Sequence, residues 1–106
     1  MFRTTANKGF HITFPNGVTV STQFGAGNYC DNHYELLKLD EERKDTFSSD
    51  CEIGVWRGEE SEWCTGEVLR AAELTDTYGQ DVVVGYVTPT DWLKIVNAAA
   101  ALPKKV

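Results

Sequence analysis

Two stretches of alternating apolar and polar residues, separated by a tight turn, constrain this chain more than any other feature. Residues 9–14 alternate in this way, and residues 18–24 do so again after Asn16-Gly17. A period of two residues is that of a strand with one buried face, and Asn-Gly favours the tight turn that connects two strands of a hairpin. The pattern predicts an N-terminal antiparallel β-hairpin, whose second face is polar and half-exposed. That polar face carries His11, Thr13, Thr19, Ser21 and Gln23.

The C-terminal part predicts a helix with a defined start. Thr88 is placed as the N-cap, Pro89 as the first helical residue and Asp91 at the third position in a capping-box role. Pro103 and the Lys104-Lys105 pair are expected to end the helix. Apolar residues recur along it at the i, i+3, i+4, i+7 spacing of a face buried on a sheet. These residues are Trp92, Ile95, Val96 and Ala99.

The middle of the chain adds less regular elements. Residues 51–57 read as a strand, and the nearly continuous apolar run 82–87 is typical of a central buried strand. Residues 67–74 favour a short helix, whereas 33–39 could form either a helix or a strand. The expectation is an α+β fold with one domain over residues 1–106. A small antiparallel β-sheet would start with the N-terminal hairpin and be packed by the C-terminal α-helix.

Composition and charge narrow the class of protein. The chain has 106 residues, of which 42% are hydrophobic and 25% charged, as in globular domains. No apolar run approaches the ~20 residues of a membrane span, and the first residues lack the apolar stretch of a signal peptide. The net charge of −6 disfavours binding to nucleic-acid phosphates. Acidic residues cluster at 40–42 and 59–62, which suits a basic protein partner.

The three cysteines, Cys30, Cys51 and Cys64, point to a reducing compartment, because a small secreted domain usually carries an even and denser set. We expect reduced thiols, no metal and no cofactor. The alternative is a tetrahedral zinc site, in which the C-x-x-H pair Cys30 and His33 joins the other two thiols. Twelve residues separate those two thiols, without a second knuckle. A catalytic cysteine with a histidine base is a weaker alternative.

The loop that follows the hairpin is the candidate binding site. It is rich in turn-forming residues, and loops held by rigid elements often carry binding residues. Its two glycines could approach phosphates, although the Walker spacing and lysine are absent. Alternatively it is a plain connection, with its tyrosine packed on the core. The predicted binding residues are Gly25, Gly27, Asn28, Tyr29, Asp31 and His33.

Three segments together resemble small accessory proteins encoded by tailed bacteriophages. They are Phe14-Pro15-Asn16-Gly17 continued through Asn32, then residues 52–56, then the closing unit 85–93. The resemblance covers about half of the chain. It assigns no catalytic residue, and it implies a phage protein that acts in the cytoplasm of the bacterial host.

Three classes of function follow. The favoured one is a non-enzymatic protein that binds and sequesters or blocks a host factor, such as a defence protein or a nucleotide signal on which Tyr29, Trp56 or Trp63 could stack. A structural component of the virion is the second. A small enzyme is the third, and it has little support because the chain holds two histidines and no H-E-x-x-H or G-x-S-x-G motif. Exposed sheet edges also predict a homo-oligomer.

Overall fold

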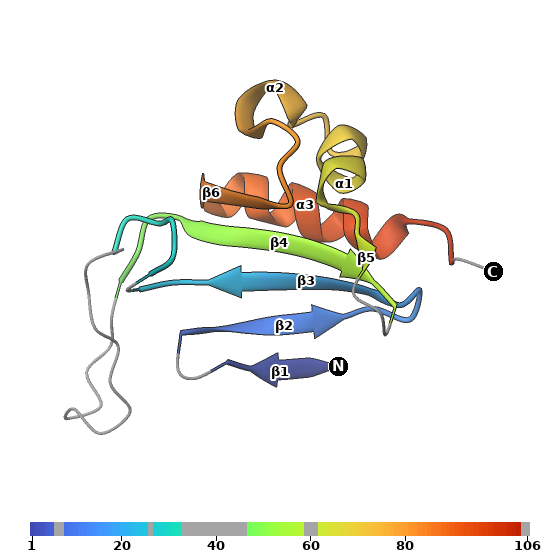
Figure 1. Ribbon diagram of the computed structural model, residues 1–106, viewed down its shortest axis with the longest axis horizontal. Coiled ribbons are helices and arrows are strands. Elements are labelled where there is room, and N and C mark those ends of the chain that lie inside the picture. Colours follow the sequence, from blue (N-terminus) through green and yellow to red (C-terminus); the bar gives the residue numbers. More distant parts are fainter. Residues whose placement is uncertain (6–7, 26, 33–46, 59–61, 105–106) are drawn as a thin grey trace.

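One antiparallel sheet organises the part of the chain that the structure describes (Figure 1). This computed structural model describes residues 1–5, 8–25, 27–32, 47–58 and 62–104. The expectations for 33–39 and 40–42, the acidic residues 59–61 and the candidate residue His33 lie outside the described residues. In chain order the elements are β1 (Phe2–Thr4), β2 (Gly9–Thr13), β3 (Val18–Gln23), β4 (Cys51–Arg57), β5 (Glu62–Trp63), α1 (Thr65–Ala71), α2 (Thr75–Tyr78), β6 (Val83–Val87) and α3 (Pro89–Ala101).

The predicted hairpin is strands β2 and β3, paired from Gly9 opposite Gln23 to Thr13 opposite Thr19. The turn holds Gly17 at φ 82°, a conformation that glycine adopts without a steric cost. The side chain of Asn16 accepts a hydrogen bond from the Val18 amide at 3.0 Å, which closes the turn. The expectation of an N-terminal hairpin is confirmed.

Strand β4 is the central strand of the sheet. It pairs with β3 along one side, while β5 and β6 share its other side. The prediction that residues 82–87 form a central buried strand is therefore wrong, because among the described strands β6 pairs only with β4. Val84 and Val87 face the core, whereas Val83 and Tyr86 are 36% and 55% exposed.

Two short strands and a helical turn were not predicted from the sequence: β1, β5 and α2. Helix α1 begins two residues before the predicted range 67–74 and ends three residues before its end. Glu73, with φ 60°, takes a left-handed conformation that a helix cannot continue through. The buried face of α1 consists of Thr65, Val68 and Leu69.

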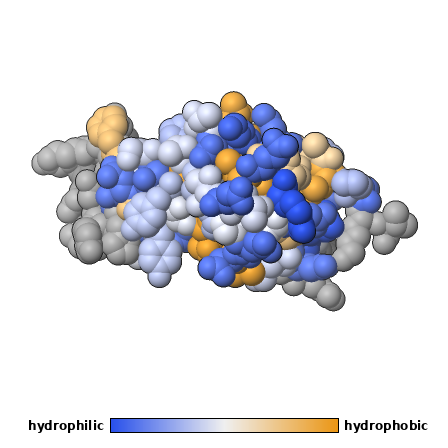
Figure 2. Space-filling view, turned by 90° about the horizontal axis from the view of Figure 1, so that it is seen from above, coloured by the Kyte–Doolittle hydropathy of each residue, from blue (hydrophilic) through white to orange (hydrophobic). Residues whose placement is uncertain are grey.

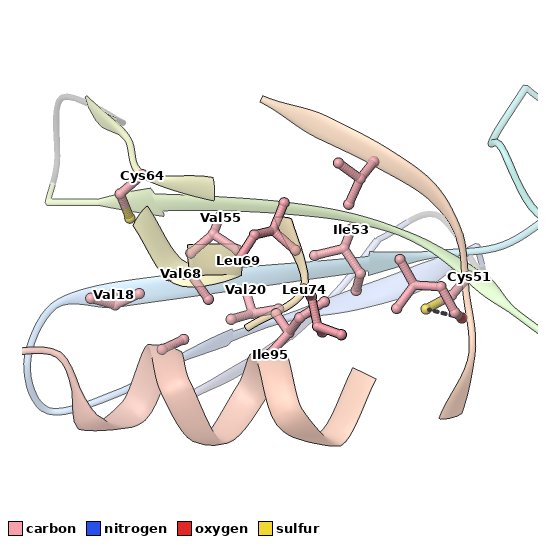
Figure 3. Packing of buried hydrophobic residues seen from close by; sticks show 13 residues of the cluster. Val18, Val20, Cys51, Ile53, Val55, Cys64, Val68, Leu69, Leu74 and Ile95 are labelled. Atoms are coloured by element: carbon pink, nitrogen blue, oxygen red, sulfur yellow. Dashed lines mark hydrogen bonds between the residues drawn. The ribbon is translucent and has the colours of Figure 1, made fainter. Parts of the chain in front are cut away.

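The hydrophobic core lies between the sheet and helices α1 and α3 (Figure 3). Val20, Ile53 and Val55 project from the sheet toward Leu69 of α1 and Ile95 of α3. All five side chains are at most 1% exposed. No helix in the described part of the chain is long and apolar enough to cross a membrane.

Helix α3 begins as predicted: the Thr88 hydroxyl accepts from the Asp91 amide, and Pro89 is the first helical residue. The Asp91 carboxylate has a different role from the predicted capping box, because it accepts a hydrogen bond from the Tyr78 hydroxyl of α2 at 2.5 Å. Trp92 is half-buried and donates through Nε1 to the Thr22 hydroxyl of β3 at 2.8 Å.

At its other end, α3 is held by the hairpin turn. Asn16 Nδ2 donates to the carbonyl oxygens of Ala99 at 2.8 Å and Leu102 at 2.9 Å. Ala99 lies in the last turn of the helix, where its oxygen also accepts a long bond of 3.4 Å from the amide of the C-cap residue Leu102. Carbonyl oxygens at a helix C-terminus lack the usual intrahelical donors, so the Asn16 side chain supplies part of what is missing. The α+β fold with a C-terminal helix packed on the sheet is confirmed, while the homo-oligomer stays a prediction.

We expect Ile95→Ala to lower the free energy of unfolding by about 2–5 kcal/mol, because a fully buried side chain leaves a cavity between α3 and the sheet. Lys94→Ala, on the exposed face of the same turn, is the matched control and should change stability by no more than about 0.5 kcal/mol. Urea denaturation followed by tryptophan fluorescence measures both. Equal midpoints for the two variants would contradict this description of the core.

Candidate functional site

The loop that follows β3, at Gly25 and residues 27–32, is held in a defined shape by its own side chains. Gly25 and Gly27 have φ angles of 79° and 84°. The buried side chain of Asn32 reaches back to accept the Gly25 amide at 2.8 Å. The Cys30 thiol, 1% exposed, donates to the same Asn32 oxygen at 3.2 Å. These contacts fix the backbone of residues 27–32.

The loop is also attached to two strands. The Tyr29 amide donates to the Glu52 carboxylate of β4 at 2.7 Å, and the Tyr29 carbonyl accepts from the Tyr86 amide of β6 at 2.9 Å. Next to this contact, position 85 must be a glycine, because a Cβ there would lie only 2.4 Å from Tyr29 Cβ. The Asp31 amide donates to the carboxylate of Asp50.

These bonds decide how the loop can interact chemically. Backbone amides in a glycine-rich loop can bind the phosphates of a nucleotide. In this chain, however, the Tyr29 and Asp31 amides already bind the carboxylates of Glu52 and Asp50. A phosphate would have to displace those carboxylates and remain close to their charge. The geometry therefore favours a basic group over an anion.

What the loop presents to solvent is aromatic and acidic. Tyr29 is 57% exposed and Tyr86 is 55% exposed, on two backbone segments joined by a hydrogen bond. The alternative in which Tyr29 packs on the core is excluded. We call this region the acidic tyrosine surface, defined by Tyr29, Asp31, Asp50, Glu52 and Tyr86.

The predicted site residues divide into supports and contact groups. Gly25 and Gly27 shape the loop, and Asn28 Nδ2 donates to the Phe24 carbonyl at 2.6 Å. Tyr29 and Asp31 are exposed. His33 lies outside the described residues. Four residues around the loop were not predicted from the sequence: Asp50, Glu52, Gly85 and Tyr86. The glycine within the apolar run 82–87 was the available signal for a close backbone approach.

The polar face of the hairpin is covered by rings more than the sequence suggested. The ring centroids of His11 and Trp56 are 4.8 Å apart, those of Trp56 and Trp63 are 5.6 Å apart, and both pairs are edge-to-face. Thr19 and Ser21 are only 8% exposed, so these two depart from the expected half-exposed face. His11 and Gln23 are half-buried and Thr13 is exposed, as expected. Burial, and then the charge of Arg3, lower the pKa of His11. A neutral imidazole suits this aromatic stack.

A pocket of about 290 Å³ opens between the hairpin, the start of β4 and the start of α3. It is mainly apolar, with the rings of Phe10, Phe24 and Trp92 on its walls. His11 is the one histidine within the described residues. It forms no hydrogen bond with a cysteine or serine of the described part of the chain. Within the described residues there is thus no hydrogen-bonded cysteine–histidine or serine–histidine pair.

The zinc set suggested by the cysteine spacing is not assembled. Cys51 begins β4, while Cys64 lies beside the far end of that strand, where its amide donates to the Val55 carbonyl (Figure 3). Two thiols at opposite ends of one strand cannot bind the same ion, since zinc–sulfur distances are about 2.3 Å. In the described part of the chain no three potential ligands gather around a common point.

On the side where α1 and α2 lie, polar and apolar residues are interspersed, and no extended apolar area stands out (Figure 2). Recognition by that face would have to be polar.

Comparisons of the chain with protein-family models, curated proteins and solved structures found no match.

Gly85→Ala should detach the loop from β6, because the new Cβ would collide with Tyr29. We expect a loss of about 1–3 kcal/mol of stability and faster hydrogen exchange at the Tyr86 amide. Gly66→Ala on α1 is the matched control: its nearest non-local atom is at 3.6 Å, so it should be neutral or stabilising. Unchanged protection of the Tyr86 amide in Gly85→Ala would contradict the proposed contact.

The Cys51 thiol gives a pH-dependence that can be measured. Burial, and then the neighbouring Asp50 and Cys30, raise the pKa of Cys51 from 9.0 to about 12. The folded state therefore retains a proton that the unfolded state releases. This contribution to stability is fully present below pH 9 and disappears as the pH rises toward 12.

Between pH 9 and 12 the free energy of unfolding should fall less steeply in Cys51→Ala than in the parent, by up to about 1.4 kcal/mol per pH unit. The pKa values of Tyr78 and Cys64 are also raised, mainly by burial, so a residual slope remains in both proteins. Urea titrations at a series of pH values give the slopes. Parallel slopes would show that Cys51 ionises as readily in the folded protein as in the unfolded one.

Proposed function

We propose that this protein is a non-enzymatic binding protein that captures a protein partner through the acidic tyrosine surface. The observation that carries the proposal is a pair of hydrogen bonds: the Tyr29 amide donates to the Glu52 carboxylate and the Asp31 amide to the Asp50 carboxylate. Those bonds hold two exposed tyrosines and the exposed Asp31 beside the half-buried Asp50 and Glu52. Tyrosine is enriched at interface hot spots because it buries a large rigid ring and keeps a polar end.

The charge of the surface indicates the class of partner. Three carboxylates lie beside the two tyrosines, in a chain whose net charge is −6. Opposite charge accelerates association and selects against wrong partners. A partner with lysine or arginine residues around an apolar contact fits this surface better than a nucleotide signal does.

The setting of the proposal is the one that the sequence resemblance implies. We propose a bacteriophage accessory protein that acts in the cytoplasm of the bacterial host, where binding would block or sequester a host protein such as a defence factor. A structural role in the virion is the alternative. It would require the same surface to be buried between virion proteins rather than against a host protein.

Tyr29→Ala should weaken capture of the partner by at least about tenfold while costing little stability, since the ring is mostly exposed. Asp31→Asn should weaken capture mainly at low salt, because its effect is electrostatic. The tagged protein is exposed to bacterial lysate, and a zero-length carboxyl-to-lysine cross-linker then identifies the bound lysine and its carboxylate. Leu93→Ala, a 52% exposed apolar residue of α3 outside the acidic tyrosine surface, is the control.

Cross-links from Asp31, Asp50 or Glu52 to one host protein, lost in Tyr29→Ala and retained in Leu93→Ala, would support the proposal. Capture that is equal in all variants would reject this surface as the binding site. Cross-links only to virion proteins in infected cells would favour the structural role.

A further inference from the structure

Among the strands that the structure describes, β1 is the edge strand on the opposite side of the sheet from β6 (Figure 1). Within the described residues β1 pairs only with β2. Met1 and Thr13 exchange two backbone hydrogen bonds, at 2.7 and 2.8 Å. Since bonded groups alternate along an antiparallel strand, Arg3 faces β2, and the amides and carbonyls of Phe2 and Thr4 point outward. The edge thus offers two donors and two acceptors in strand geometry.

One face of this edge is apolar. Phe2 is 72% exposed, and its ring centroid lies 6.1 Å from that of Phe10. Phe10 in turn makes an edge-to-face contact with Trp92, with a centroid distance of 6.4 Å. The rings of Trp92, Phe10 and Phe2 therefore form a row from the core to the edge of the sheet, where the Phe2 ring is exposed to solvent. A strand added beside β1 could cover Phe2 with an apolar side chain.

The other face of the edge is positively charged. Arg3 stands opposite His11 on the face of the sheet that α1 and α3 leave uncovered. It is exposed, and no carboxylate in the described part of the chain forms an ion pair with it. A residue of an added strand that lies directly opposite Arg3 would be close enough to form such a pair.

We propose that the β1 edge binds an extended segment of a partner protein that carries a carboxylate opposite Arg3 and an apolar residue beside Phe2. Addition of a strand to an open edge uses the backbone for affinity and alternate side chains for specificity. A second copy of this chain is a poorer occupant, because the antiparallel register that uses all of β1 sets Arg3 against the partner's Arg3. A like-charge pair in that position is destabilising and is one way in which edges avoid self-association.

The test uses the full chain, labelled with ¹⁵N, and an acetylated and amidated peptide of sequence Thr-Val-Glu-Val-Thr. Versions with Gln or Lys in place of Glu are the controls for charge. The Glu peptide should shift the Phe2 and Thr4 amide signals in a saturable way. The Gln peptide should bind about two- to fivefold more weakly, and the Lys peptide more weakly still.

Two variants separate backbone pairing from charge. Thr4→Pro removes an outward amide and leaves the bonds to β2 intact, since proline is tolerated on edge strands, so the shifts should disappear. Arg3→Glu should reverse the preference from the Glu to the Lys peptide. Lys94→Ala, an exposed cation on α3, should bind all three peptides as the parent does.

Three results would overturn the proposal. They are the absence of shifts at β1 up to about 5 mM peptide, equal binding of the three peptides, and β1 shifts that depend on protein concentration without peptide. The last result would assign the edge to a second copy. Because none of these measurements involves the acidic tyrosine surface, their failure would leave the proposed function standing, and the reverse also holds.

Discussion

The pairing of β4 with three other strands is the constraint on which the rest of the structure depends. β4 joins the hairpin on one side to β5 and β6 on the other, so it connects segments that are otherwise far apart in sequence. Its residues Ile53 and Val55 belong to the part of the core that the sheet contributes opposite α1 and α3. On its exposed side, Glu52 holds the loop backbone through the Tyr29 amide. A single strand therefore positions both the core and the candidate site.

Features set by neighbouring residues were predictable from the sequence. The alternation in 9–24 determines which side chains of the hairpin face the core, because a shift of one residue would turn Val18 and Val20 away from it. The start of α3 follows from Thr88 and Pro89 alone, since the cap and the missing amide act within one turn. The loop 25–32 was identified as a candidate site on composition, and the structure places Tyr29 and Asp31 on its surface.

Features set by distant residues could not be predicted in this way. The apolar run 82–87 looks like a central strand, yet its position is decided by β5, which occupies the remaining part of the β4 edge. Glu52 and Asp50 read as ordinary charged residues flanking a strand, and only the fold shows that they bind the loop amides. Similarly, the sequence explains Asn16 fully as a turn residue, although it has a second role 83 positions away.

That second role of Asn16 affects the order in which the chain can become structured. The hairpin is made early during synthesis, but its turn side chain and its core face remain without their partners until residues 89–101 have left the ribosome. Trp92 and Thr22, 70 positions apart, are subject to the same delay. Contacts of such large sequence separation slow folding because the loop must close before any contact compensates for it. Until α3 is available, the hairpin exposes an apolar face and its edges, which are the features that make incompletely folded chains prone to aggregation.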